Sequence, residues 1–133
     1  MAHTPSSPPI LYSVTASLPD EPTAQAYIGW LGNGHVQAVL KCGASRGWVV
    51  RVLPDDDTPR ATQPVRVRSS YLFPSRDAYE TYVREHAPAL RADGLARFGP
   101  ERGVTMVREL SEVLWPAMDG SSTPELPVGV LVH

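Results

Sequence analysis

The stretch ILYSVTASL, residues 10–18, alternates apolar and polar side chains from Tyr12 onward, with Ser13, Thr15 and Ser17 as its polar positions. Successive side chains of a strand point to opposite faces, so this pattern predicts a β-strand with one face buried. The buried face would carry Ile10, Tyr12, Val14, Ala16 and Leu18. A Pro/Ser-rich arm, residues 1–9, precedes the strand and is expected to be flexible.

The residues after this strand predict a kinked helix over 23–43. Its apolar stripe consists of Tyr27, Ile28, Leu31, Ala38, Val39 and Cys42 at helical spacing. The stretch GNG, residues 32–34, interrupts the stripe, because each glycine inside a helix costs about 1 kcal/mol relative to alanine. We expect a kink there, with Asn33 capping a second helical segment.

Two more strands are predicted over RGWVVRVLP (46–54) and PVRVRSSYLF (64–73), joined by a solvated loop over 55–63. One face of the later strand would carry Val65, Val67, Ser69, Tyr71 and Phe73. Arg66 and Arg68 fall on the opposite face, where they would make salt bridges across a dimer or line a solvated edge.

A second helical region follows, with Ser75 as its predicted N-cap. Pro88 is expected to break it near His86, because proline lacks an N–H and disfavours helical geometry at the residue before it. Gly94 is predicted to end the region in the left-handed conformation. The loop LARFGPERG then leads to a fourth strand, VTMVREL, residues 104–110.

The predicted order of elements is the βαββαβ plan of ferredoxin-like α+β folds. Two helices would cover one face of a four-stranded antiparallel sheet, and the bare face would need a cover. A twofold homodimer through that face is the simplest solution. The domain would span residues 10–110, and the apolar piece VGVLV of the extension over 111–133 would either add a strand or pack on the partner protomer.

The composition argues against several classes of protein. The chain has 133 residues and a net charge of −2, from 14 acidic and 12 basic side chains. No basic stripe is interleaved with aromatic residues, so nucleic acid is not an expected partner. No apolar run approaches the roughly 20 residues that span a bilayer, so no membrane partner is expected. Because Cys42 is the single cysteine and no secretory signal is visible, we expect a cytoplasmic protein.

His35 is the main catalytic candidate. It falls on the apolar stripe, four residues after Leu31 and four before Val39, so its imidazole is expected to face the sheet. An imidazole there could act as a general acid or base near neutral pH. The alternative is a core histidine that bonds a strand carbonyl or a tyrosine.

Aromatic side chains are the candidates for holding a planar substrate. Trp30 lies beside the stripe, and Trp48 or Tyr12 would form an aromatic wall with it; Tyr71 is a further candidate. The alternative role is packing or dimer contact. If Asn33 does not cap the helix, its amide could orient a carbonyl or a peroxide.

Basic side chains around the predicted helix end are candidates for holding an anion. Arg91 and Arg97 flank Gly94, and guanidinium groups make bidentate bonds with carboxylates. Alternatively, one of them pairs with Asp93 or caps helix carbonyls. His86 is either a substrate contact or a partner of the helix C-terminus.

No motif in the sequence indicates a metal, nucleotide or serine-hydrolase site. The three adjacent acids at 55–57 are expected to form a solvated turn. We therefore expect neither a metal nor a tightly bound cofactor.

Four stretches together resemble a small bacterial family of unknown function, namely YSVTASL, YIGWLGNGHVQAVLKCG, YETYVREHAPALRADGLARFG and VTMVREL. That family is assigned to the dimeric α+β barrel superfamily, whose best-known enzymes are the antibiotic biosynthesis monooxygenases. The resemblance covers residues 10–110, and HAPALRADGLARFG is its most specific part. It implies a dimer with a pocket in each protomer between the sheet and the helices.

Two functional hypotheses follow. The first is an enzyme of specialised metabolism that binds a hydrophobic or aromatic, partly anionic small molecule. It would use His35 for cyclisation, isomerisation or dehydration, or, as a near variant, for cofactor-free oxygenation. The alternative is a non-catalytic dimeric ligand-binding or accessory protein. A cavity of about 300 Å³ beside His35 would favour the enzyme, and a filled space would favour the alternative.

Overall fold

The computed structural model describes residues 8–54 and 63–114. Its elements, in chain order, are β1 (Ile10–Leu18), α1 (Glu21–Trp30), the kinked segment η1 (Leu31–His35), α2 (Val36–Lys41), β2 (Arg46–Val52), β3 (Val65–Phe73), α3 (Arg76–Glu85), α4 (Ala87–Arg97), the short turn η3 (Pro100–Arg102) and β4 (Thr105–Glu112). The four strands lie where the sequence predicts them, with ends that differ by at most two residues.

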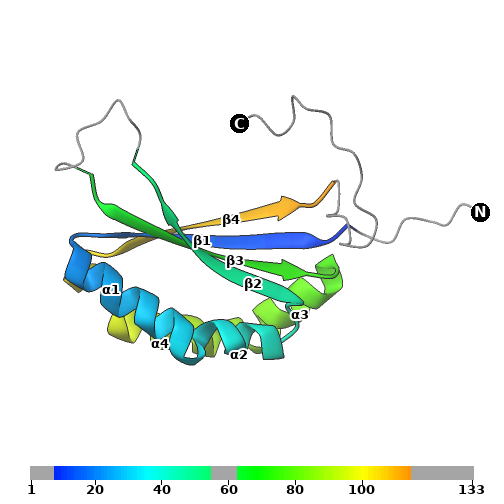
Figure 1. The fold of residues 1–133 in the computed structure, drawn as a ribbon. Coiled ribbons are helices and arrows are strands. Elements are labelled where there is room, and N and C mark those ends of the chain that lie inside the picture. Colours follow the sequence, from blue (N-terminus) through cyan, green and yellow to red (C-terminus); the bar gives the residue numbers. More distant parts are fainter. Residues whose placement is uncertain (1–7, 55–62, 115–133) are drawn as a thin grey trace, which may run out of the picture.

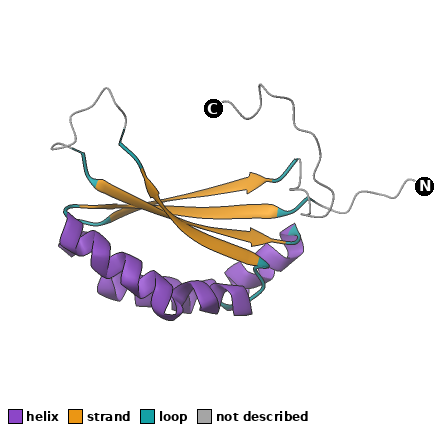
Figure 2. Cartoon of the chain, viewed as in Figure 1, coloured by secondary structure: helices purple, strands orange, loops and turns teal. Residues whose placement is uncertain are grey.

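The sheet is antiparallel and has the order β2-β3-β1-β4. β1 lies between β3 and β4, so that Tyr12 stands opposite Tyr71 on one side and Leu110 on the other. The helices of the described residues all lie on one face of this sheet (Figure 1, Figure 2). The predicted α+β fold of the ferredoxin-like type is therefore confirmed.

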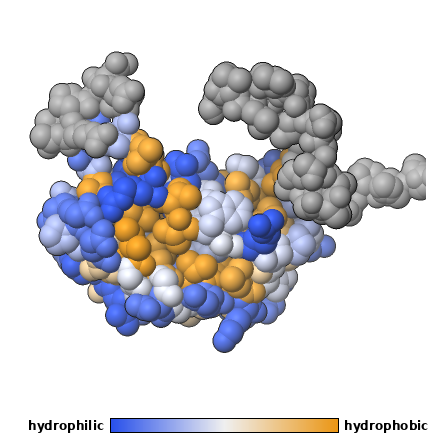
Figure 3. Space-filling model, in the orientation of Figure 1, coloured by the Kyte–Doolittle hydropathy of each residue, from blue (hydrophilic) through white to orange (hydrophobic). Residues whose placement is uncertain are grey.

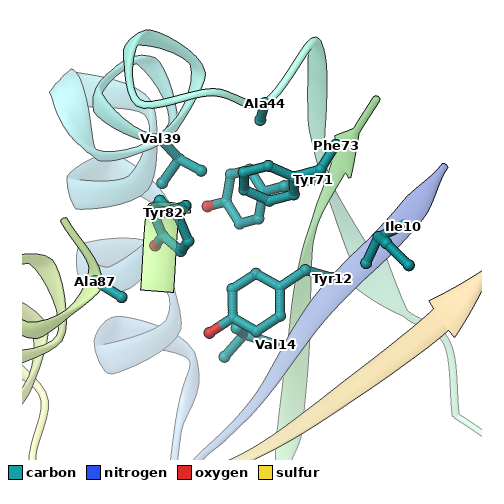
Figure 4. Close-up of a cluster of buried hydrophobic side chains, with 9 residues drawn as sticks. All are labelled: Ile10, Tyr12, Val14, Val39, Ala44, Tyr71, Phe73, Tyr82 and Ala87. Carbon is teal, nitrogen blue, oxygen red and sulfur yellow. The ribbon is translucent and has the colours of Figure 1, made fainter. Parts of the chain in front are cut away.

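The core lies between the sheet and the helices, where the alternation in β1 predicts it. The whole predicted inner face of β1 is buried. One core cluster joins Tyr12 and Tyr71 of the sheet to Tyr82 of α3 (Figure 4). A second cluster joins Leu18 of β1 to Tyr27 of α1 and to residues after α4. The cavity described below is lined by members of both clusters.

The helix breaks follow from capping groups and from proline. Asp20 caps α1 by accepting a hydrogen bond from Thr23 N at 2.9 Å, so α1 begins at Glu21, two residues before the predicted start. Ser75 caps α3 as predicted, accepting from Ala78 N at 3.1 Å. His86 separates α3 from α4, and Pro88 sits in the first turn of α4, which confirms the predicted break.

The kink in the first helical region is confirmed, but the predicted cap is wrong. Asn33 and Gly34 have non-helical backbone angles, and Gly34 has a φ of 127°, which favours glycine. At the kink, the backbone N–H of Gly34 donates a hydrogen bond to Gln37 Oε1 at 3.1 Å. The side chain of Gln37, three residues after Gly34, therefore makes the capping hydrogen bond that was expected from Asn33.

Gly94 is also corrected, because it does not end its helix. α4 continues to Arg97, and Gly94 is buried within it. A Cβ atom at position 94 would lie 3.2 Å from Cη2 of Trp30. The glycine is thus explained by the close approach of an indole ring. After α4, the glycine that adopts the left-handed conformation is Gly103, which ends η3.

The other face of the sheet is open and partly apolar. Trp48 and Val50 of β2 are 42% and 39% exposed, and Val107 of β4 is 63% exposed. Apolar residues (orange) are visible at the surface among hydrophilic ones in Figure 3. Arg66 and Arg68 lie on this face, as predicted, and Arg68 Nε donates to Thr15 Oγ1 at 3.0 Å.

The prediction that Trp48 forms an aromatic wall with Trp30 is wrong. Trp48 stands opposite Ser70 on the open face, whereas Trp30 belongs to a helix on the covered face. The two indoles are therefore separated by the sheet.

No helix in the described part of the chain is long and apolar enough to cross a membrane. The acidic triplet at 55–57 and most of the extension over 111–133 lie outside the described residues.

Candidate functional site

A small, partly open space, here called the inner cavity, lies between the sheet and the helices. Its walls come from β1, β3 and β4 on one side and from α1, η1, α3 and α4 on the other. Its volume is about 40 Å³. Ligand pockets commonly measure about 300 Å³ or more, so this space alone holds only a small chemical group.

A wider and more open hollow, here called the outer groove, adjoins the inner cavity. Its volume is about 460 Å³. Trp30, His35 and Leu90 line both spaces. These three side chains, here called the junction residues, therefore lie between the two spaces.

The structure brings most of the sequence-predicted site residues to these two spaces. The inner cavity is lined by Tyr12, Trp30, His35, Tyr71 and Arg91. The outer groove is lined by Asn33 and Arg97 together with Trp30 and His35. His86 lines neither space and lies between α3 and α4.

His35 is half-buried and stacks on Trp30. The centroids of the two rings are 4.2 Å apart and the ring planes differ by 26°. Burial lowers the pKa of His35 from its ordinary value of 6.5, and the carboxylate of Asp93 opposes this shift. The imidazole is therefore neutral at neutral pH, which is the form that accepts a proton.

Asp93 of α4 holds the other edge of the Trp30 ring. Trp30 Nε1 donates to Asp93 Oδ2 at 3.3 Å, and Arg97 Nε donates to Asp93 Oδ1 at 3.2 Å. The hydrogen bond from Arg97 is the main cause of the lowered pKa of Asp93. Of the two roles considered for Arg97, the structure therefore shows the pairing with Asp93.

Tyrosine side chains dominate the inner cavity. Figure 4 shows Tyr12 and Tyr71 rising from adjacent strands toward Tyr82 on α3. Burial raises the pKa of Tyr71 to about 12, and it also raises the pKa of Tyr27 and Tyr82. All three hydroxyls stay protonated at neutral pH and can donate hydrogen bonds to a ligand.

Two guanidinium groups, of Arg91 and Arg108, interact with the hydroxyl of Tyr12. Arg108 Nε of β4 donates to Tyr12 Oη at 3.2 Å. Arg91 of α4 also interacts with the Tyr12 hydroxyl; burial alone would lower its pKa, but this interaction contributes to a net rise. No aspartate or glutamate of the described residues lines the inner cavity. The inner cavity therefore carries positive charge with no acidic side chain at its wall.

Two polar atoms at this cavity lack a partner. Tyr71 Oη and Arg91 Nε are buried and make no hydrogen bond with the described residues. The Ser69 hydroxyl lies near enough to Tyr71 to lower its pKa in part, but not in hydrogen-bonding geometry. Buried polar atoms are almost always bonded, so a pair of orphans at one cavity calls for an explanation.

Sequence reasoning missed several residues of the cavity, among them Tyr27, Ser69, Tyr82 and Arg108. Tyr82 and Tyr27 lie on helix faces that the sequence shows to be apolar, but their hydroxyls carried no pattern of their own. Arg108 offered a better signal, because it interrupts the apolar positions Met106 and Leu110 on the inner face of β4.

The described residues contain no group of three or more His, Cys, Asp or Glu side chains that could hold a metal ion.

The sequence profile of DUF4286, described as a domain of unknown function, matches residues 9–113. None of the curated proteins matches the chain closely enough in sequence to count as a relative. Solved structures, by contrast, show the same fold at low sequence identity.

A protein described as dimeric and ferredoxin-like, from an uncultured marine organism, is 14% identical; the match covers 84% of this chain and 100% of that one, with a TM-score of 0.59. A second protein of that description and source is 12% identical over 86% and 95% of the two chains, with a TM-score of 0.54. A Bacillus halodurans protein of the ethyl tert-butyl ether d (EthD) family is 13% identical over 78% and 99%, with a TM-score of 0.55. At these identities the similarity concerns the fold alone.

Proposed function

The chain belongs to the DUF4286 family, whose function is unknown, and we propose that it is a small enzyme of specialised metabolism. It binds a hydrophobic or aromatic, partly anionic molecule and works by acid/base chemistry without a tightly bound cofactor. The observation that carries this proposal is the position of His35, whose half-buried imidazole lines both the inner cavity and the outer groove.

The chemistry follows from the groups on either side of that imidazole. Neutral His35 takes a proton from a carbon next to a carbonyl group, and Arg108 and the Tyr82 hydroxyl, both at the inner cavity, stabilise the resulting enolate oxygen. Return of the proton at another carbon gives an isomerisation. Attack of the same carbanion on a second carbonyl gives a cyclisation, and loss of a neighbouring hydroxyl gives a dehydration. In the oxygenase variant the carbanion adds O₂, and the protonated hydroperoxide loses water to leave a carbonyl group on that carbon.

Proton exchange tests the proposal without knowledge of the natural substrate. Phenylpyruvate combines an aromatic ring, a carboxylate and an enolisable methylene group, and its exchange with deuterated water can be followed by proton NMR. We expect the protein to accelerate exchange and His35→Gln to reduce the rate to background. His86→Gln is the matched control, because His86 lines neither space, and it should keep the wild-type rate.

A second candidate function is supported by the small volume of the inner cavity, about 40 Å³. A non-catalytic accessory or binding protein needs no larger space. Wild-type protein that leaves phenylpyruvate and related keto acids at the background exchange rate would favour this function over the enzyme.

For either function we propose a homodimer formed through the open face of the sheet. The exposed side chains of Trp48, Val50 and Val107 support it, as does the description of two structurally similar proteins as dimeric. Trp48→Glu should convert dimers to monomers in sedimentation equilibrium, because it buries a charge in an apolar contact. Ala92→Glu, an exposed change on α4 at a residue that lines neither space, is the control. We also propose a cytoplasmic location, which the free thiol of Cys42 supports.

A further inference from the structure

We infer that the inner cavity is a seat for a single carboxylate group, bound by Tyr71 Oη and Arg91 Nε, and that the ligands of this protein are carboxylic acids with an apolar body in the outer groove. This inference rests on the proposed function in so far as it assigns the ligand to the same site. It adds the chemical class of the ligand and the residues that select it.

The first argument is the hydrogen-bonding character of the two orphan atoms. Tyr71 is 1% exposed, and neither its hydroxyl nor Arg91 Nε has a partner in the described residues. A guanidinium N–H can only donate, and a neutral phenol donates readily. Two donors on residues that line one space fit a group that only accepts, and a carboxylate has two acceptor oxygens.

The second argument is charge. Arg91 and Arg108 both line the inner cavity, and no acidic side chain of the described residues does. Arg108 is partly engaged by Tyr12 Oη at 3.2 Å. Arg91 is in none of the ion pairs seen in the described residues, whereas Arg97 on the same helix is paired with Asp93. A bound anion would therefore meet no competing carboxylate.

The third argument is size. The inner cavity measures about 40 Å³, and a single water needs about 10–15 Å³. The space therefore holds roughly three heavy atoms, which is the number in a carboxylate. A phosphate or sulfonate group has more heavy atoms and a tetrahedral shape, so the volume favours the planar carboxylate.

The position of the junction residues then orients the rest of the ligand. Trp30, His35 and Leu90 line both spaces, so the chain of atoms attached to the carboxylate must pass them to reach the outer groove. This route brings the carbons nearest the carboxylate to His35, which is where the proposed proton transfer takes place.

Binding is tested with 3-phenylpropionate as the probe, by isothermal titration or by NMR. Its neutral isostere 3-phenylpropionamide and the tetrahedral anion 2-phenylethylphosphonate serve as comparisons. We expect the carboxylate to bind at least about tenfold more tightly than either, as expected for charge-assisted hydrogen bonds. Equal affinity for the amide, preference for the phosphonate, or no binding of the carboxylate up to its solubility would overturn the inference.

Two substitutions should weaken this binding by about tenfold each, Tyr71→Phe and Arg91→Gln, because each removes one donor. The controls are Tyr79→Phe, a neighbouring ring that does not line the cavity, and Arg84→Gln on the exposed surface of α3. Unchanged affinity in both Tyr71→Phe and Arg91→Gln would show that the carboxylate binds elsewhere.

The free protein supplies a readout that a purely structural hydroxyl would not. Tyr71→Phe removes a buried polar atom without a partner, so it should raise Tm by a few degrees while it weakens binding. A lowered Tm would mean that the hydroxyl already has an internal partner, and it would overturn the inference.

The two proposals can fail separately. If His35→Gln and the wild type bind 3-phenylpropionate equally and neither accelerates proton exchange, the carboxylate seat stands and the enzymatic function falls. If exchange depends on His35 but neutral ketones exchange as fast as keto acids, the enzymatic function stands and the carboxylate seat falls.

Discussion

The indole of Trp30 lies over the imidazole of His35, with ring centroids 4.2 Å apart, and the opposite end of the indole presses on α4. Trp30 is thereby held by the His35 ring, the Asp93 carboxylate and the close approach of Gly94, and it also contacts the rings of Tyr27 and Phe98. This arrangement sets the position and the protonation of the residue on which the proposed chemistry depends.

Gly94→Ala tests the fit of Trp30 against α4. The new Cβ would lie 3.2 Å from Trp30 Cη2, and the ring is held in place by its bond to Asp93. Overpacking of about 1–3 kcal/mol outweighs a gain in helix propensity of about 1 kcal/mol. We expect urea unfolding to show a net loss of about 1 kcal/mol.

Gly29→Ala is the matched control for that change. Gly29 lies in α1, and no atom comes within 4 Å of a Cβ placed there. It should stabilise the protein by up to about 1 kcal/mol. Stabilisation by both substitutions would contradict the tight contact of Trp30 with Gly94.

The lowered pKa of His35 predicts a pH dependence of stability. The unfolded chain binds a proton at this residue near pH 6.5, and the folded protein binds it only at lower pH. The unfolded state therefore holds more protons in that interval, and stability falls as pH drops from 6.5 toward the lowered pKa. Urea unfolding at a series of pH values should show this fall in the wild type. The fall should be smaller in His35→Gln, and an equal fall in both proteins would contradict the assignment.

Asp93→Asn should lower the pKa of His35 further, because it removes the negative charge that favours the imidazolium form. The amide oxygen can still accept the bond from Trp30 Nε1, so the stack should remain. The pKa can be measured by NMR titration of the His35 ring protons. Asp77→Asn, which replaces an acid in the first turn of α3, should leave the titration unchanged. A raised pKa in Asp93→Asn would contradict the geometry.

Gln37→Ala should destabilise the protein more than Asn33→Ala does. The Gln37 side chain accepts from Gly34 N at 3.1 Å and donates to Gly32 O at 3.4 Å, so it bonds both sides of the kink. The expected loss is about 0.5–1 kcal/mol in urea unfolding. Asn33→Ala should change stability by less, because no cap bond is made by its side chain. The reverse order would restore Asn33 as the cap.

Much of the fold could be predicted because its signals are local. Alternation within residues 10–18 identifies β1 and its buried face, Ser75 caps α3, and Pro88 separates α3 from α4. Each signal acts through covalent geometry or through hydrogen bonds within a few residues. The two wrong assignments, at Asn33 and Gly94, concern residues whose role depends on a contact rather than on intrinsic preference.

The candidate site could be predicted only in part. His35 was expected to face the sheet, Trp30 and Tyr71 were candidates for holding a substrate, and the structure places all three at the cavity. Arg97 and Arg91 looked equivalent in sequence, but one pairs with Asp93 and the other faces the tyrosines. Trp48 looked like a partner of Trp30, although the sheet lies between them.

The sequence by itself thus determined the elements, their order and the side of each element that is buried, because hydrophobic periodicity and capping are properties of short segments. The tertiary structure alone decided which side chains share a cavity, which guanidinium group is left without an acidic partner, and how much space lies between them. Those quantities depend on distances between atoms of α4, β3 and β4, which no periodicity within one segment encodes.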